Sequence, residues 1–179
     1  QFRHRRLLAS IGDALDESGL TPNRLQVEIT ETTLLDAGET TLGILRDLRT
    51  LGVRVALDDF GTGYSSLNYL RKFPFDKVKI DKSFVDDIDA NAQSRAIVRA
   101  IMELTEALGM TTVAEGVETL SQLFELRALG CAEIQGYVIS AAIEAEAVRD
   151  HLGVGLGRFT ADLVEPADLE LVGVGEAAA

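Results

Sequence analysis

Short apolar runs alternate along this chain with segments of helical spacing, from about residue 6 to about residue 151. The apolar runs lie at residues 25–29, 53–57, 77–80, 112–114 and 133–138, and each has the length of a strand. The intervening segments carry four apolar stripes with helical spacing: Leu8, Ile11 and Leu15; Leu42, Leu45 and Leu48; Ile97, Ile101, Leu104 and Leu108; Leu123, Leu126 and Leu129. Strands that alternate with helices predict an α/β fold, a parallel sheet covered by helices.

Helix ends are marked by glycines and by one capping pattern. Gly52, Gly109 and Gly130 each follow the last apolar position of a predicted helix, where a left-handed C-terminal residue is common. Thr119 and Gln122 have the spacing of a capping box, which predicts the start of the helix that runs to Leu129.

Acidic residues follow successive strands, which favours a (β/α)8 barrel of the TIM type over an open doubly wound sheet. They are Glu28 and Glu31, Asp58 and Asp59, Asp81, and Glu115 and Glu118. In a barrel the C-terminal strand ends converge on one mouth, where active sites are built. Eight units need about 250 residues, so we expect an incomplete barrel with about five of eight strands. Residues 1–152 would form this partial barrel, and residues 153–179 a tail or linker with a short docked strand around residues 169–172.

Bulk properties limit the classes of function. The 179 residues carry a formal net charge of −12, which argues against binding a nucleic-acid polymer. No apolar stretch has the roughly 20 residues of a membrane span. The single cysteine, Cys131, excludes an internal disulfide and favours the cytoplasm. A small anionic ligand remains compatible with the charge, because a metal ion inverts the local sign.

Four carboxylates at three predicted strand ends form a candidate metal site, with Lys79 on the strand between them. They are Glu28, Asp58, Asp59 and Glu115. Acids held together repel unless a cation neutralises them, and oxygen-only ligands favour Mg²⁺ or Mn²⁺. Simpler explanations exist for each residue: Asp and Gly after a strand are common in turns, Glu28 could be solvated, and Lys79 could pair with Asp81.

Five ordered motifs make the resemblance to a known family specific. They are Glu28-Ile29-Thr30-Glu31, Asp58-Asp59-Phe60-Gly61-Thr62-Gly63-Tyr64-Ser65-Ser66-Leu67, Lys79-Ile80-Asp81-Lys82-Ser83-Phe84, Val113-Ala114-Glu115-Gly116-Val117-Glu118 and Gln135-Gly136-Tyr137. Over roughly residues 1–152 the chain closely resembles an EAL domain, the bacterial signalling phosphodiesterase module that linearises cyclic di-GMP to pGpG.

The resemblance implies a two-metal site. By it, Glu28 would bind the first metal, Asp58 would bridge the two metals, and Asp59 would bind the second. Glu115 would be a ligand or the general base for the attacking water, and Lys79 would position that water or a phosphate oxygen.

Supporting roles are also implied by the resemblance. Gln135 and Asp81 would line the substrate site, and Glu31 would hold the loop at residues 60–66, a family role linked to metal binding and dimerisation. The complete group with a loop-stabilising role is Glu31, Gly61, Thr62, Gly63 and Glu118. EAL domains often dimerise and often follow a diguanylate cyclase or sensory domain, so both are expected partners besides cyclic di-GMP.

The chain departs from the family pattern in two places. The Glu-Ala-Leu signature and the strand with the family's asparagine ligand are absent, so two ligands of the first metal are missing from this sequence. Ser140 is followed by Ala141-Ala142, where the family usually has Ser-x-Pro. Three functions therefore stay open: a cyclic di-GMP phosphodiesterase, a module that binds cyclic di-GMP or a protein without hydrolysis, and an inactive fragment.

Overall fold

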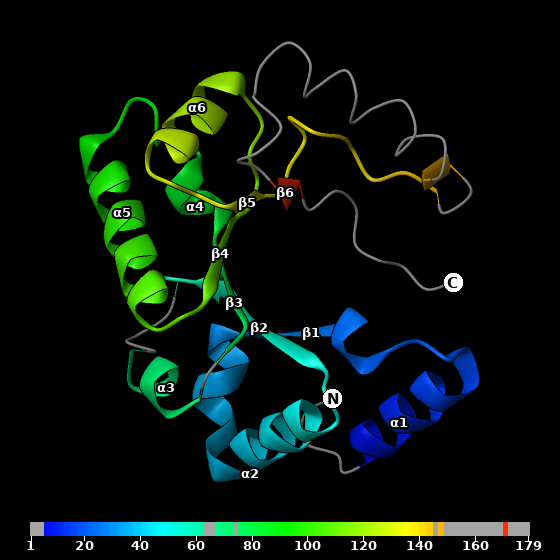
Figure 1. The fold of residues 1–179 in the computed structure, drawn as a ribbon. Helices are drawn as coiled ribbons and strands as arrows, with labels where there is room; N and C mark the ends of the chain where they lie inside the picture. The colour runs from blue at the N-terminus through cyan, green and yellow to red at the C-terminus, as the bar shows by residue number, and fades with distance from the viewer. Residues whose placement is uncertain (1–5, 63–66, 74, 145–146, 149–169, 172–179) are drawn as a thin grey trace.

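The computed structural model describes residues 6–62, 67–73, 75–144, 147–148 and 170–171, and these form one parallel sheet with its helices (Figure 1). The strands are β1 (Gln26–Thr30), β2 (Arg54–Phe60), β3 (Lys77–Ile80), β4 (Thr111–Ala114), β5 (Glu133–Ile134) and β6 (Glu170–Leu171). The helices are α1 (Arg6–Ser18), α2 (Glu31–Thr50), α3 (Leu67–Lys72), α4 (Lys82–Val85), α5 (Ala92–Ala107) and α6 (Leu120–Ala128), with a 3₁₀ turn at Pro22–Arg24.

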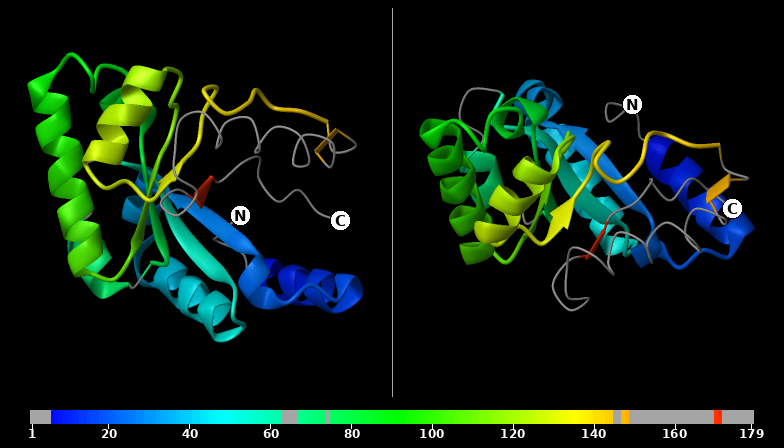
Figure 2. Two further views of the ribbon diagram at one scale, coloured as in Figure 1. Left: turned by 45° about the horizontal axis from the view of Figure 1, so that its top comes forward. Right: turned by 90° about the horizontal axis from the view of Figure 1, so that it is seen from above.

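The strand order is the chain order, and every neighbouring pair is parallel. This arrangement confirms the predicted α/β fold and its five main strands. A strand placed beside its predecessor in sequence, with a helix between them, is the repeating unit of a (β/α) barrel. Figures 1 and 2 show the helices arranged around the outside of a curved sheet.

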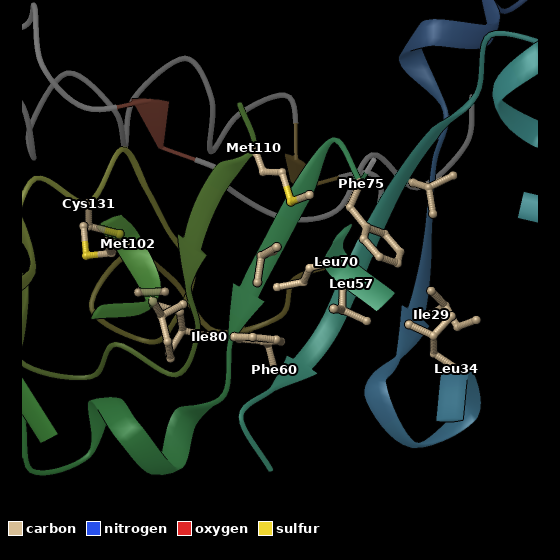
Figure 3. Close-up of a cluster of buried hydrophobic side chains, with 14 of the residues drawn as sticks. Ile29, Leu34, Leu57, Phe60, Leu70, Phe75, Ile80, Met102, Met110 and Cys131 are labelled. Atoms are coloured by element: carbon tan, nitrogen blue, oxygen red, sulfur yellow. The ribbon is translucent and has the colours of Figure 1, made fainter. Parts of the chain in front are cut away.

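Alternation along the strands divides the sheet into an apolar and a polar face. Side chains such as Leu57, Val78 and Ile80 are fully buried under the helices. Figure 3 shows part of this core, in which Phe60 and Ile80 lie close to Leu57 and Leu70. Because successive strand residues point to opposite faces, the neighbours Glu28, Asp58 and Lys79 point to the other side. The hydrophobic layer therefore fixes which residues reach the candidate site.

The fifth strand is shorter than the sequence predicts. The prediction was residues 133–138, whereas β5 ends at Ile134. The backbone turns at Gly136, where the φ angle is +158° and an added Cβ would lie 2.2 Å from the carbonyl oxygen of Val117. The amide of Val138 then donates to the same oxygen at 2.9 Å. Residues after Ile134 therefore close over the end of β4 instead of extending the sheet.

The buried face of helix α5 overlaps the predicted stripe only in part. Of the predicted residues, Ile101 is buried, Ile97 and Leu104 are half-buried, and Leu108 is 41% exposed. The buried face consists of Ser94, Val98, Ile101, Met102 and Thr105. Thr105 Oγ1 donates to the carbonyl of Met102 or Ile101 and meets Thr112 Oγ1. Hydroxyls with partners can lie in the core, so a purely apolar pattern located one edge of the buried face and missed the other.

The predicted helix ends are confirmed. Gly52, Gly109 and Gly130 have φ angles of +92°, +72° and +88°. Thr119 and Gln122 form a capping box at the start of α6.

The last described strand lies in the predicted tail. Two residues, Glu170 and Leu171, pair in parallel with β5, at the position where a short docked strand was expected. The boundary between residues 152 and 153 stays a prediction, because it lies outside the described residues. Within the described ranges, no helix combines the length and apolar character needed to cross a membrane.

Candidate metal and active site

A bulge at the end of β2 brings two adjacent carboxylates to the same site. Leu57 pairs with Val78 and Phe60 with Ile80, so three steps on β2 match two steps on β3. Asp59 takes a left-handed conformation with a φ angle of +54°, which Asp tolerates better than most residues. A regular strand would send the two carboxylates to opposite faces. Here, one carboxylate oxygen each from Asp58, Asp59 and Glu115 lie within 4.8 Å of one another.

Lys79 is the centre of the site. Its Nζ lies 2.6 Å from Glu115 Oε1, 2.7 Å from Glu28 Oε2 and 3.1 Å from Asp58 Oδ1. The side chain of Lys79 is only 8% exposed, so these interactions are shielded from water. Burial lowers the pKa of Lys79, but hydrogen bonds to Glu115 and Glu28 outweigh it, and the pKa is raised above its usual range. The lysine is therefore a fixed positive charge between three strands.

The single positive charge of Lys79 does not balance the negative charges of the carboxylates around it. Burial raises the pKa of Asp59, and the nearby Asp58 and Asp81 raise it further. Burial also raises the pKa of Glu115, although Lys79 opposes this shift. Asp58 Oδ1 is buried, and Lys79 Nζ, at 3.1 Å, is shared with Glu28 and Glu115. Several carboxylates that share one lysine, together with the raised pKa values of Asp59 and Glu115, fit a site that holds an additional cation.

Glu31 contacts the loop after β2. Glu31 is 1% exposed at the start of α2, and its Oε2 accepts a hydrogen bond from the Gly61 amide at 2.9 Å. Gly61 has a φ angle of +103°, and an added Cβ would lie 2.6 Å from Phe84. Both the backbone angle and the contact require glycine. Thr62 Oγ1 donates to the carbonyl of Asp59 at 2.9 Å, while Gly63 lies outside the described residues.

The remaining predicted residues lie at the neighbouring strand ends. Asp81 caps α4 by accepting from the Ser83 amide at 3.0 Å. Among the described residues, Lys79 pairs with Glu28, Asp58 and Glu115 and not with Asp81, which argues against a simple Lys79–Asp81 ion pair. The exposed Gln135 follows β5, and its backbone N–H donates to the carbonyl of Ala114, the residue before Glu115.

Glu118 belongs to a connection between two loops that the sequence only partly predicts. Lys82 Nζ lies 2.9 Å from Glu118 Oε1, and Gln122 links the same loop to Asp86. Gln122 was identified only as a helix cap, and nothing in its spacing indicates the second contact.

Comparison with known proteins agrees with the geometry. The EAL domain family profile matches residues 1–142. Protein y4lL of Sinorhizobium fredii is 48% identical over 145 residues, covering 81% of this chain and 18% of that protein. The bifunctional diguanylate cyclase/cyclic di-GMP phosphodiesterase MucR of Pseudomonas aeruginosa is 41% identical over 146 residues, covering 82% of this chain and 21% of MucR. The chain thus spans about a fifth of the length of these curated relatives.

Solved structures give the same result. The MucR phosphodiesterase in complex with c-di-GMP superposes with a TM-score of 0.78 and 40% identity, covering 82% of this chain and 60% of that one. Klebsiella pneumoniae BlrP1, solved with c-di-GMP and with manganese or calcium, gives a TM-score of 0.74 and 37% identity, covering 78% of this chain and 36% of that one. The five main strands thus match part of the barrel of these structures. This chain belongs to the EAL domain family, whose relatives include cyclic di-GMP phosphodiesterases.

Proposed function

We propose that this chain forms part of a phosphodiesterase that hydrolyses cyclic di-GMP to linear pGpG in bacterial signalling, with Mg²⁺ or Mn²⁺. The observation that carries the proposal is the cluster of Asp58, Asp59 and Glu115, whose carboxylate oxygens lie within 4.8 Å of one another beside the buried Lys79. A purely structural ion pair needs one carboxylate for one lysine, whereas three carboxylates surround Lys79 here.

The donor set fits hard divalent cations. All candidate ligands are carboxylates, the chemistry that Mg²⁺ and Mn²⁺ prefer. Asp58, whose buried Oδ1 lies 3.1 Å from Lys79 Nζ, would bridge two ions, and Asp59 and Glu115 would hold the second. Glu28, whose Oε2 lies 2.7 Å from Lys79 Nζ, would bind the first. When bound, such ions supply an activated water and stabilise the charge that develops on the phosphate.

The chain's own residues would orient the reacting groups. Lys79, with an ammonium fixed by three carboxylates, would hold the attacking water or a phosphate oxygen and offset negative charge on the phosphate. Glu115, with its raised pKa, would bind metal or accept the proton of the water. Asp81 and Gln135, at the two flanking strand ends, would contact the substrate.

A turnover assay tests the proposal. This chain would be incubated with cyclic di-GMP and Mn²⁺, and pGpG would be followed by chromatography with and without chelator. Chelator-sensitive pGpG supports the phosphodiesterase, and absence of pGpG in the presence of bound substrate contradicts it. Calorimetric titration of cyclic di-GMP in the same samples measures that binding.

The second candidate is a module that binds cyclic di-GMP without hydrolysis. The specific observation in its favour is that the Lys79 ammonium already lies within 3.1 Å of Glu28, Asp58 and Glu115, and so neutralises part of their charge without a metal ion. Binding without product would favour this candidate. Neither binding nor product would favour the inactive fragment.

Partners and location follow from the proposed function. We propose a homodimer and an association with a diguanylate cyclase or sensory domain, which the bifunctional name of MucR supports by similarity. The cytoplasmic location expected from the single Cys131 stays a prediction.

A further inference from the structure

The side chain of Gln122 connects two loops at the mouth of the sheet. It is only 5% exposed, in the first turn of α6. Its Oε1 accepts hydrogen bonds from the amides of Glu118 at 2.8 Å and Thr119 at 3.0 Å. Its Nε2 donates to the carbonyl of Asp86 at 3.1 Å. The first two contacts cap the helix, whereas the third reaches a residue 36 positions earlier, at the end of α4.

The two connected loops carry the residues of the candidate site. Asp86 ends α4, which begins immediately after Asp81 and two residues after Ile80, next to Lys79. Glu118 and Thr119 end the loop that begins with Glu115. At the start of this loop, the Glu115 amide donates to the carbonyl of Ile80 at 3.1 Å. The Glu115 loop is therefore held to the end of β3 at its start, and at its end to residues 81–86, the segment after β3 that is called the β3 loop below.

Gln122 provides the buried part of this connection. Lys82 and Glu118 also bridge the loops, but their side chains are 44% and 43% exposed. Exposed ion pairs contribute little, because water and salt screen them. A buried amide that loses its partner leaves a polar group unsatisfied, which has a larger effect. Gly116 adds close packing, since an added Cβ would lie 2.4 Å from the Lys82 side chain.

We propose that Gln122 is a positioning residue, which holds the Glu115 loop against the β3 loop so that Glu115, Asp58 and Asp59 keep their spacing for a divalent cation. The inference rests on the proposed function of the site and adds a residue that does not touch metal or substrate. A metal site requires its ligands within about 0.5 Å of their productive positions, so a small shift of this loop weakens binding.

The substitution Gln122→Glu separates positioning from helix capping. A glutamate at this position still accepts from the two amides, because Thr-x-x-Glu is itself a capping box. It cannot donate to the Asp86 carbonyl, and its carboxylate repels that oxygen. Thr119→Ala makes the opposite change, since it removes the hydroxyl cap of α6 and leaves the bond to Asp86. Gln93→Glu, at an exposed position in the first turn of α5, controls for the added charge.

The measurement is the dissociation constant of Mn²⁺ alone, from the electron paramagnetic resonance signal of the free ion, together with the melting temperature. We expect Gln122→Glu to weaken Mn²⁺ binding about tenfold, the lower end for groups that orient metal ligands. We expect Thr119→Ala to lower the melting temperature by about 2–4 °C with wild-type Mn²⁺ affinity. Gln93→Glu should match the wild type in both.

Equal Mn²⁺ affinity in Gln122→Glu and the wild type would overturn the inference while leaving the proposed metal site intact. Absence of Mn²⁺ binding in the wild type would overturn both. If Gln122→Glu does not fold, Gln122→Met serves instead. Gln122→Met loses both the helix cap and the bond to Asp86, whereas Thr119→Ala loses only the cap. Weaker Mn²⁺ binding by Gln122→Met than by Thr119→Ala supports positioning, and equal Mn²⁺ binding by the two variants contradicts it.

Discussion

Asp59→Asn separates the contribution of the site to metal binding from its contribution to the fold. Asp59 is one of the three clustered carboxylates, and burial, Asp58 and Asp81 all raise its pKa. Replacement by asparagine removes one of the repelling charges. Asparagine also accepts the left-handed backbone at φ +54°. Without metal, the variant should therefore be at least as stable as the wild type at pH 7.

The effect of metal should be large and specific to the wild type. At a free Mn²⁺ concentration of 100 times its dissociation constant, binding stabilises the fold by about 2.7 kcal/mol. For a chain of this size this corresponds to a rise in melting temperature of roughly 5–11 °C. Loss of a direct ligand should weaken binding at least as much as loss of an outer-shell partner, which costs about 10- to 100-fold. A 100-fold loss leaves only about 0.4 kcal/mol, or roughly 1–2 °C, at the same concentration.

Thermal unfolding followed by circular dichroism, with Mn²⁺ or with chelator, measures both effects. Asp13→Asn, at an exposed position of α1, is the matched control and should keep the wild-type response. An undiminished Mn²⁺ shift in Asp59→Asn would refute the assignment of Asp59 as a ligand. A loss of several degrees without metal would refute the argument that the carboxylates repel one another.

Two further predictions concern the centre of the site and its loop. Lys79→Met should destabilise the fold at pH 7 by about 3–5 kcal/mol, because breaking a buried ion pair leaves its acids uncompensated. Without the lysine, the pKa of Glu115 should rise further above its usual value, so the folded state binds more protons than the unfolded state. The stability of the variant should therefore fall as pH rises above about 4.5. Denaturant titrations between pH 4 and 8 check the sign, and a stability that rises with pH would contradict it. Gly61→Ala should cost about 1–3 kcal/mol because of its φ angle and the contact with Phe84. The control Gly12→Ala, in open space within α1, should be neutral or stabilising. Equal effects of Gly61→Ala and Gly12→Ala in urea denaturation would argue against the described geometry of the loop at Gly61.

Much of the fold could be predicted because local signals and the tertiary structure agree. The runs at residues 77–80 and 112–114 are short, apolar and bounded by polar residues, and both are strands in the structure. The glycines at positions 52, 109 and 130 have the backbone angles that end a helix. These features depend on a few neighbouring residues, so the sequence displays them directly.

Features that depend on contacts between distant segments were predicted less well. The buried face of α5 includes Thr105, whose hydroxyl finds partners on the helix and on β4. The early end of β5 depends on the contact of Gly136 with Val117. Neither contact has a signature in the local sequence.

The candidate site shows the same division. Residue types and strand ends indicated the carboxylates and Lys79, and the family resemblance supplied their expected roles. The β2 bulge that turns Asp58 and Asp59 toward one site could have been suspected, because two adjacent acids at a strand end cannot otherwise share a face. The bond from Gln122 to Asp86 joins residues 36 positions apart and requires the structure.

The most direct test of the account compares metal-dependent turnover in the wild type and in Asp58→Asn. Asp58 carries a buried carboxylate oxygen in the cluster with Asp59 and Glu115, and it would bridge the two ions. With cyclic di-GMP and Mn²⁺, the account predicts chelator-sensitive pGpG from the wild type and loss of nearly all turnover in Asp58→Asn, with the circular dichroism spectrum unchanged. Near-normal hydrolysis by a folded Asp58→Asn would contradict a reaction at this carboxylate cluster.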